Sequence, residues 1–374
     1  MEKKQSVLKS LKSYIFNKFN LFQKIQANTF LNKSRYMFTY RNISIGNILV
    51  RFHKKALKEP RGIGRASREL FKQLQVLSKT SNTRKINDIK KVVFFYPTIH
   101  WCPEQLPHPS CILILDVIPM LFPDIFGEIA EEWATKFKPI AQQADKVLTI
   151  SNSSAHDISR LLDIPLNKIG VIYMGITKLP IVKNKTLKLP DSNFIVYLGA
   201  YDRHKNIEVV FKAMLEPQIQ NILLVMIGSN KRAQKLVSDM NISDRVFFLG
   251  RLKDEEVGYV ISKALALVCP SLYEGFGLPP LEAALLGIPS ICSSRPAMTE
   301  ILNNAALFAS PDNPKEWSEA IMLLRDNAPL RKRVSLQAEE RAKSFPWKKC
   351  SQKLVEELQV FITTDMVAIR DTDV

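Results

Sequence analysis

The sequence has few cysteines and no pattern that would join them or let them hold a metal. Five occur among 374 residues, and no two of them form a Cys-x-x-Cys pair; they are Cys102, Cys111, Cys269, Cys292 and Cys350. An odd number without paired spacing argues against a disulfide framework and against a zinc site. These absences favour a reducing compartment, so we expect a cytoplasmic protein.

Long apolar runs are also missing. No stretch reaches the ~18 apolar residues of a transmembrane helix, and the best candidate, residues 111–122, is interrupted by Asp116 and Pro119. The first residues lack the apolar core and small-residue cleavage site of a signal peptide. We therefore expect no segment that spans a membrane, which still allows the protein to lie on a membrane surface.

Acidic residues are scarce at the front of the chain. Residues 1–91 hold 22 Lys and Arg against four acids, a net charge of +18, whereas the remainder is near neutral and the total is +17. Such a basic front favours a phosphate-rich partner, namely nucleic acid, anionic lipid or a phosphorylated substrate. We do not expect nucleic acid, because aromatic side chains interleaved with basic ones and recognisable binding motifs are absent.

Residues 1–45 are predicted to form a basic, amphipathic extension. Between residues 7 and 25, apolar side chains recur at helical spacing, and lysines flank the apolar stripe. This layout is typical of a helix in a membrane interface, with lysines reaching toward anionic headgroups. In that case residues 1–30 would attach the protein peripherally to the inner face of the plasma membrane. The alternatives are a helix docked on the protein's own body and a disordered segment.

From residue 46 onward, short apolar runs alternate with helical stretches. Length and a 46% apolar content predict about two globular domains. Strands are predicted at 47–52, 91–96, 112–116, 146–150, 170–173, 194–198, 222–227, 245–249, 265–269 and 289–292. Helices are predicted at 66–77, 207–214, 231–240, 254–263 and 280–286. Continuously apolar strands alternating with helices indicate parallel sheets covered on both faces, hence a doubly wound α/β architecture.

A stretch rich in Lys, Pro and Asn without a periodic apolar face divides the chain. It predicts an interdomain linker at 179–193. The front domain would span 46–178 and the rear domain 194–345, followed by a C-terminal helix and tail at 346–374. Two such domains form a cleft where the carboxyl ends of both sheets face each other, and nucleotides favour that place.

The strongest motif follows the apolar run at 265–269. Glu274 and Glu282 stand eight positions apart, with Gly275 and Gly277 between them and two prolines at a predicted helix start. Glycines let a ligand approach the backbone, and free N–H groups at a helix start favour an anion. A carboxylate in that turn can accept hydrogen bonds from a sugar diol. The structural alternative is that Glu282 complements the helix dipole and that the glycines and prolines shape a turn.

Seven segments, in the same order, resemble the retaining glycosyltransferases of family 4, which have the GT-B fold. The segment EGFGLPPLEA at 274–283 resembles the family's Glu-x7-Glu motif. The other six are GIGRASREL at 62–70, DVIPMLFP at 116–123, SNSSAHD at 151–157, VIYMG at 171–175, YLGAYDRHKN at 197–206 and FPW at 345–347. The resemblance covers roughly residues 60–350. It implies two doubly wound Rossmann-like domains facing each other across a cleft, with the acceptor on the front domain and the nucleotide sugar on the rear one.

The resemblance implies catalytic roles for three residues. Glu274 would contact the donor sugar. Lys205, together with Arg203, would neutralise the leaving diphosphate, whose charge grows in the transition state, where fixed cations lower the barrier. The alternative for the two cations is a solvated turn.

The resemblance also implies a set of donor-binding positions. Glu282 would hold the ribose hydroxyls, and backbone groups would lie against the sugar and diphosphate at Phe276, Gly277 and Leu278. The backbone N–H groups of Gly62 and Gly64 would approach the phosphates from the other domain. Asp116 would lie in the cleft, with a turn at a strand end as its alternative role.

Three positions depart from the family pattern. Leu115 stands where many relatives have a histidine before the aspartate, Ala200 where they often have arginine, and Met174 where they have asparagine. The chain must manage without that histidine or use another group. The pair Asp371 and Asp373 looks like a metal-binding Asp-x-Asp but follows no strand, so no metal site is expected.

The resemblance implies a retaining hexosyltransferase that needs neither a metal nor another cofactor. It would move a hexose, with mannose as a candidate, from a nucleotide diphosphate sugar to a glycan or lipid-linked acceptor in surface polysaccharide synthesis. The sequence offers no clear nucleophile, which favours departure and attack on the same face of the sugar. The alternative is a non-catalytic GT-B scaffold subunit of a glycosyltransferase complex, supported only by Leu115.

Overall fold

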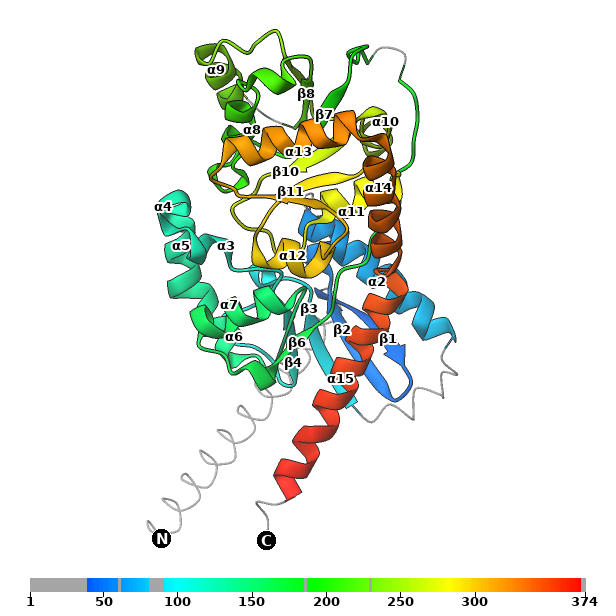
Figure 1. The fold of residues 1–374 in the computed structure, drawn as a ribbon. Helices are drawn as coiled ribbons and strands as arrows, with labels where there is room; N and C mark the ends of the chain where they lie inside the picture. The colour runs from blue at the N-terminus through cyan, green and yellow to red at the C-terminus, as the bar shows by residue number, and fades with distance from the viewer. Residues whose placement is uncertain (1–38, 60–61, 81–90, 185–186, 229–230, 371–374) are drawn as a thin grey trace, which may run out of the picture.

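The computed structural model describes residues 39–59, 62–80, 91–184, 187–228 and 231–370 (Figure 1). These residues form two α/β halves, each built on its own six-stranded sheet. The halves lie one above the other in Figure 1, and the chain passes between them near residue 180. Residues 1–30, with the predicted amphipathic helix, lie outside the described residues.

The first sheet runs in chain order across six neighbouring strands. They are β1 (Tyr40–Ile45), β2 (Ile48–His53), β3 (Lys91–Tyr96), β4 (Ser110–Leu113), β5 (Lys146–Thr149) and β6 (Ile169–Val171). β1 pairs with β2 in antiparallel register, and the other neighbours are parallel. The first sheet therefore begins inside the segment that was predicted as an extension through residue 45. β1 escaped prediction because Arg41 and Asn42 interrupt its apolar pattern.

The second sheet is parallel throughout and changes direction in the middle. Its strands are β7 (Phe194–Leu198), β8 (Leu223–Ile227), β9 (Val246–Gly250), β10 (Ala266–Cys269), β11 (Ser290–Ser293) and β12 (Leu307–Ala309). Their order is β12-β11-β10-β7-β8-β9, so successive strands are added first on one side of β7 and then on the other. Every strand predicted from an apolar run is present in one of the two sheets, and β12 is a further short strand.

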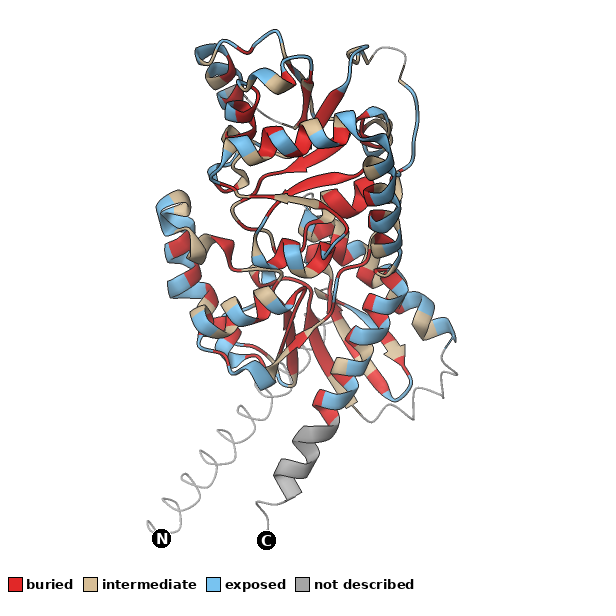
Figure 2. Ribbon diagram, in the orientation of Figure 1, coloured by how far each residue is buried: buried red, intermediate tan, exposed pale blue. Residues whose placement is uncertain are grey.

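Helices cover the faces of both sheets (Figure 2). The longer ones are α2 (Gly62–Thr80), α7 (Asn152–Leu162), α9 (Lys231–Asp239), α10 (Asp254–Lys263), α11 (Leu278–Leu285), α13 (Pro314–Asp326), α14 (Ala328–Lys343) and α15 (Trp347–Arg370). Shorter ones are α3 (Ile118–Leu121), α4 (Pro123–Phe126), α5 (Glu128–Glu132), α6 (Lys138–Gln143), α8 (Glu208–Ala213) and α12 (Pro296–Leu302). Each half can bury apolar strands because amphipathic helices shield them; α2, for example, buries Leu70 and Leu74 and exposes Arg68.

The C-terminal helix joins the two halves. α15 begins beside the second sheet and runs down along the first, as Figure 1 shows in red. Its Leu354 and Leu358 are fully buried, and Glu357 accepts a 2.9 Å ion pair from Lys146 of β5. The predicted C-terminal helix is therefore a structural part of the first half as far as residue 362. One cluster of buried apolar side chains also continues from the first sheet into the second.

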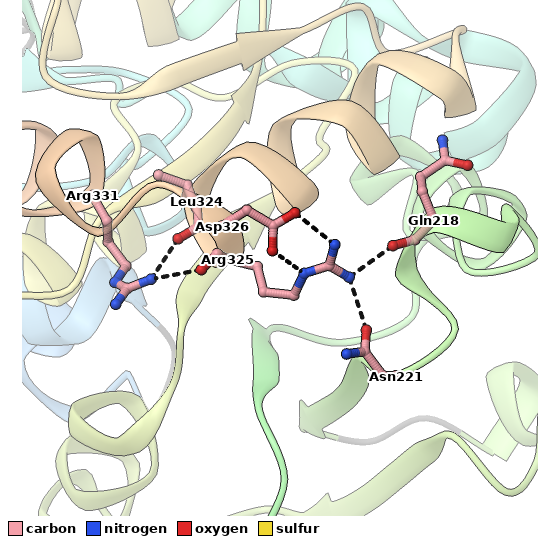
Figure 3. A network of polar contacts seen from close by, with 6 residues as sticks. All are labelled: Gln218, Asn221, Leu324, Arg325, Asp326 and Arg331. Carbon is pink, nitrogen blue, oxygen red and sulfur yellow. Dashed lines mark hydrogen bonds and ion pairs between the residues drawn. The ribbon is translucent and has the colours of Figure 1, made fainter.

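An arginine network fixes the outer layer of the second half (Figure 3). Arg325 donates to the carbonyl of Gln218 at 2.7 Å and to Asn221 at 2.8 Å, while Asp326 accepts two bonds from the same guanidinium. Arg331 donates to the carbonyl of Leu324 at 2.6 Å, near the end of α13. The Arg325 bonds tie α13 to the segment that enters β8, and the Arg331 bond ties α14 to the end of α13.

Candidate functional site

The reversal of strand order in the second sheet creates the site. β7 and β10 are parallel neighbours, with Ala266 opposite Ile195, and later strands are added on both sides of them. The loops after these two strands therefore leave the sheet side by side, which is where open α/β sheets bind ligands. Lys205 lies on the loop after β7 and Glu274 on the loop after β10. Their charged groups meet at 2.7 Å.

The loop that carries Lys205 is anchored on both sides. Residues Arg203–Lys205 form one 3-10 turn, which ends at Asn206 in the left-handed region at φ 51°. The Asn206 amide donates to the carbonyls of Pro270 at 3.2 Å and Pro311 at 2.8 Å. The backbone N–H of Leu272 donates to the carbonyl of His204 at 2.8 Å. These bonds hold the two loops together and fix the place of the ammonium group.

Glu274 is a largely buried carboxylate, with its side chain 14% exposed, and its charge is compensated. Its Oε1 accepts from Lys205 Nζ at 2.7 Å and from the Ser271 hydroxyl at 2.7 Å. Burial raises the pKa of Glu274, but Lys205 and Ser271 outweigh it and hold that pKa below its ordinary value. Burial lowers the pKa of Lys205, and Glu274 more than restores it. Both groups therefore stay charged at neutral pH and form a fixed pair.

Glu282 lies on the helix that follows the Glu274 loop and has a different partner. It sits on α11, and its Oε1 is 2.7 Å from Arg65 Nη1 on α2 of the first half. The Glu282 side chain is 7% exposed and that of Arg65 36%. Burial raises the pKa of Glu282, and the guanidinium of Arg65 offsets only part of that rise. Arg65 belongs to the GIGR segment, but the sequence held no signal that it would pair with Glu282.

The loop between the two carboxylates rests on the first half. A Cβ added at Gly275 would lie 3.1 Å from Asp116 Oδ2 and 3.2 Å from Ile150 Cδ1, so a side chain here would require these neighbours to shift by a few tenths of an ångström. Gly277 precedes α11 at φ 88°, and a Cβ there would lie 2.8 Å from Met298 Sδ. Phe276 is buried, with its ring 5.4 Å from that of Phe345. α11 begins at Leu278, two residues before the predicted start at residue 280.

Asp116 follows β4 and faces a hollow of the first half. Its Oδ1 accepts the backbone N–H of Ile118 at 3.2 Å, and burial raises the pKa of the carboxyl. The charges of Lys205 and Glu274 both reach it. The hollow has a volume of about 520 Å³ and aromatic walls; among its lining residues are Trp101, Leu115, Asp116, Phe126 and Trp133. Leu115 gives this wall an apolar side chain where the resemblance led us to look for histidine.

The remaining predicted residues are spread more widely. Gly64 is packed against the backbone, since an added Cβ would lie 1.7 Å from the carbonyl oxygen of Glu59. Close packing within the first half thus accounts for this glycine. Gly62 borders a hollow of about 520 Å³ between the halves, which Arg65 and Asp254 also line. Arg203 is exposed on the loop after β7, two positions before Lys205.

Two polar contacts between the halves were not predicted. Glu300 of α12 accepts the backbone N–H groups of Asn152 at 2.8 Å and Ser153 at 2.9 Å, and thus caps the start of α7. The Tyr273 hydroxyl donates to Asp157 at 2.5 Å. Both pairs lie far apart in sequence, and no local pattern identifies such partners.

Within the described part of the chain, no group of three or more His, Cys, Asp or Glu side chains is arranged to hold a metal ion. Asp371 and Asp373 lie outside that part. Among the same residues, no helix is both long and apolar enough to cross a bilayer.

Comparison with known proteins gives one family and several relatives. The model of the family described as glycosyl transferases group 1 matches residues 180–341. The chain is 30% identical to the O-antigen chain mannosyltransferase RfbU of Salmonella typhimurium over 266 residues, which cover 66% of this chain and 73% of the relative. It is 27% identical to O-antigen chain mannosyltransferase B of Escherichia coli over 229 residues, covering 57% and 60%. Among solved structures, sucrose-phosphate synthase from Thermosynechococcus elongatus matches with a TM-score of 0.61 at 24% identity, covering 73% of this chain and 74% of that one.

Proposed function

The chain belongs to the group 1 glycosyl transferases and has the GT-B fold, and from this premise we propose that it is a retaining hexosyltransferase of surface polysaccharide synthesis. The hexose would be mannose, donated by GDP-mannose and passed to a glycan or lipid-linked acceptor. Two relatives, both O-antigen chain mannosyltransferases, support the sugar and the pathway class. The observation that carries the proposal is the Lys205–Glu274 pair where the strand order reverses.

The donor would lie along the facing edge of the second sheet. The ammonium of Lys205 is available to the diphosphate from its partly exposed side, since the side chain is 27% exposed. Arg203 would have to turn inward from its exposed position to assist. Glu282 would bind the ribose diol, which requires it to release Arg65. The guanidinium thus freed lies beside the hollow that Gly62 and Asp254 border.

We propose that retention of the anomeric configuration results from departure of the diphosphate and attack by the acceptor on the same face of the sugar. Glu274 is a weak nucleophile because the hydrogen bonds from Lys205 and Ser271 hold its pKa below the ordinary value and so reduce the basicity of the carboxylate. Its fixed negative charge can instead stabilise the positive charge that develops at the anomeric carbon. Lys205 would stabilise the departing diphosphate with a charge that the protein itself supplies, so that we propose no metal and no other cofactor.

The acceptor would enter the aromatic hollow of the first half. Its volume of about 520 Å³ suits a sugar unit, and Trp101 and Trp133 offer faces for stacking. Asp116 lies at the end of this hollow nearest to the Glu274 loop, as its contact distance to Gly275 indicates. Its raised pKa makes it a better proton acceptor for an incoming hydroxyl than an ordinary aspartate.

Calorimetric titration with nucleotide sugars, followed by transfer assays, tests this proposal. We expect GDP-mannose to bind more tightly than UDP sugars and to be turned over by the wild type. Glu282→Gln should bind it about tenfold more weakly, the loss of one charge-assisted hydrogen bond. Equal and absent turnover in the wild type and in Glu282→Gln would instead support a non-catalytic scaffold.

We also propose peripheral attachment to the cytoplasmic face of an anionic membrane through residues 1–30, and no role for nucleic acid. The support is the +18 charge of residues 1–91. Co-sedimentation with vesicles that contain anionic lipid should be strong for the full chain and lost after deletion of residues 1–30. Equal sedimentation of both proteins would contradict the attachment.

A further inference from the structure

His204 is a buried imidazole between the charged pair and the first half. It stands directly before Lys205 and is 7% exposed. Its ring centroid lies 5.3 Å from that of Phe126 on α4, and Phe126 lines the aromatic hollow that also contains Leu115 and Asp116. On its other side, the imidazole is close enough to Glu274 and Lys205 for their charges to act on it. A side chain of the second half thus packs against a wall residue of that hollow, beside the Lys205–Glu274 pair.

The Nδ1 atom of His204 has no hydrogen-bond partner among the described residues. Leaving a buried polar nitrogen unpaired costs about 1–3 kcal/mol, so such an atom is retained only where something else compensates for it. Burial and the neighbouring Lys205 both lower the pKa of His204. The ring is therefore neutral at physiological pH, and a neutral imidazole nitrogen can exchange a hydrogen bond with an uncharged hydroxyl.

We propose that His204 is a sugar-binding residue whose Nδ1 forms a hydrogen bond with a hydroxyl of the transferred hexose. The inference rests on the proposed function and assigns to this site a residue for selecting the sugar. Because the bond is made to the sugar and not to the nucleotide, His204 distinguishes a nucleotide sugar from the bare nucleotide.

Three substitutions separate this role from packing. His204→Phe keeps a ring against Phe126 and removes both nitrogens. His204→Asn places an amide near the position of Nδ1, whereas His204→Gln places it near that of Nε2. The matched control is His53→Phe, because His53 is also buried with an unpartnered Nδ1 but lies in the aromatic cluster of Tyr40 and Tyr96.

The measurement is calorimetric binding of GDP-mannose and of GDP by each full-length variant, with UDP-glucose and UDP as a second pair. For the pair that the wild type binds, His204→Phe should weaken the nucleotide sugar about tenfold and leave the nucleotide within twofold. His204→Asn should bind the nucleotide sugar better than His204→Gln, and that comparison decides the matter if His204→Phe does not fold. His53→Phe should change neither affinity.

Equal losses for sugar and nucleotide, or no loss in His204→Phe, would overturn the role of His204 and leave the proposed function intact. The same holds if Asn and Gln bind equally. A wild type that binds none of these nucleotide sugars would overturn the proposed function together with this inference.

Discussion

Glu274 and Glu282 stand eight positions apart in one motif, yet the protein treats their charges in opposite ways. Glu274 is held by Lys205 and Ser271 of its own half, and its pKa lies below the ordinary value. Glu282 is held by Arg65 of the other half, and its pKa lies above the ordinary value. Glu274 is paired within the half that carries it, whereas Glu282 is paired with a partly exposed arginine of the other half.

This difference suggests separate roles for the two carboxylates in the proposed reaction. A charge fixed before the substrate arrives costs no reorganisation during the reaction, which suits a group that acts on the transition state. On the proposed function, Glu282 would serve reversible binding, because the donor's ribose would replace Arg65 without leaving the carboxylate unpaired. The comparison therefore predicts that Glu274 governs the rate and Glu282 governs the affinity.

Removal of Lys205 should have the largest effect. Lys205→Ala leaves Glu274 without its cation and removes the charge that we propose for the departing diphosphate. We expect kcat/KM to fall about 100- to 1000-fold, mostly through kcat. Steady-state transfer kinetics measure this, with Lys212→Ala as the control, since Lys212 is exposed on α8 of the same half. A Lys205→Ala enzyme that keeps its kcat and loses only affinity would break the division of roles.

Exchange of partners at Glu282 should have the next largest effect. Glu282→Gln should weaken the binding of a nucleoside diphosphate about tenfold, whereas Arg65→Ala should bind it at least as tightly as the wild type because the competing cation is gone. Calorimetry on both variants measures this, with the exposed Glu319→Gln as a control. If Arg65→Ala binds as weakly as Glu282→Gln, Arg65 is a donor ligand and not a competitor.

A change of pH should distinguish the two carboxylates, and this is the smallest of the expected effects. The folded pKa of Glu282 is above 4.5 and that of Glu274 below it, so as the pH falls Glu282 takes up its proton first. Folding stability from Glu274 is present above its unfolded pKa and is lost as the pH falls through its lower folded pKa. Glu282 has the opposite sign, because the folded state binds its proton more tightly and gains stability as the pH falls through the folded pKa.

The measurement is thermal unfolding and nucleotide binding as a function of pH. Wild-type affinity should begin to fall at a pH above 4.5, while the affinity of Glu282→Gln should stay level over that window. Identical pH profiles for the two proteins would show that Glu282 does not control binding.

Much of the fold was predictable, because buried parallel strands are continuous apolar runs. β7 is apolar throughout and β3 is apolar after Lys91 at its start, and both were predicted at their observed limits. β1 was missed because two adjacent exposed polar residues, Arg41 and Asn42, break its apolar pattern. The return of α15 to the first half was equally hidden, since Leu354 and Leu358 form an apolar face without naming the surface that they cover.

The site was predictable only as far as its residues share a motif or a strand end. Lys205 and Glu274 follow apolar strands, and the meeting of their loops depends on which strands are neighbours, which the sequence does not state. The partners across the interface, Arg65 for Glu282 and Glu300 for the start of α7, are set by how the halves pack. His204 gave no signal, because its burial and its unpaired nitrogen exist only in the folded chain.

A crystal structure of the protein with GDP-mannose bound would test the central claim most directly. We predict that the diphosphate contacts Lys205, that Glu282 has exchanged Arg65 for the ribose hydroxyls, and that the Lys205–Glu274 pair is unchanged beside the sugar. A nucleotide found away from the edge where β7 and β10 end, or bound with the Arg65–Glu282 pair intact, would contradict this account.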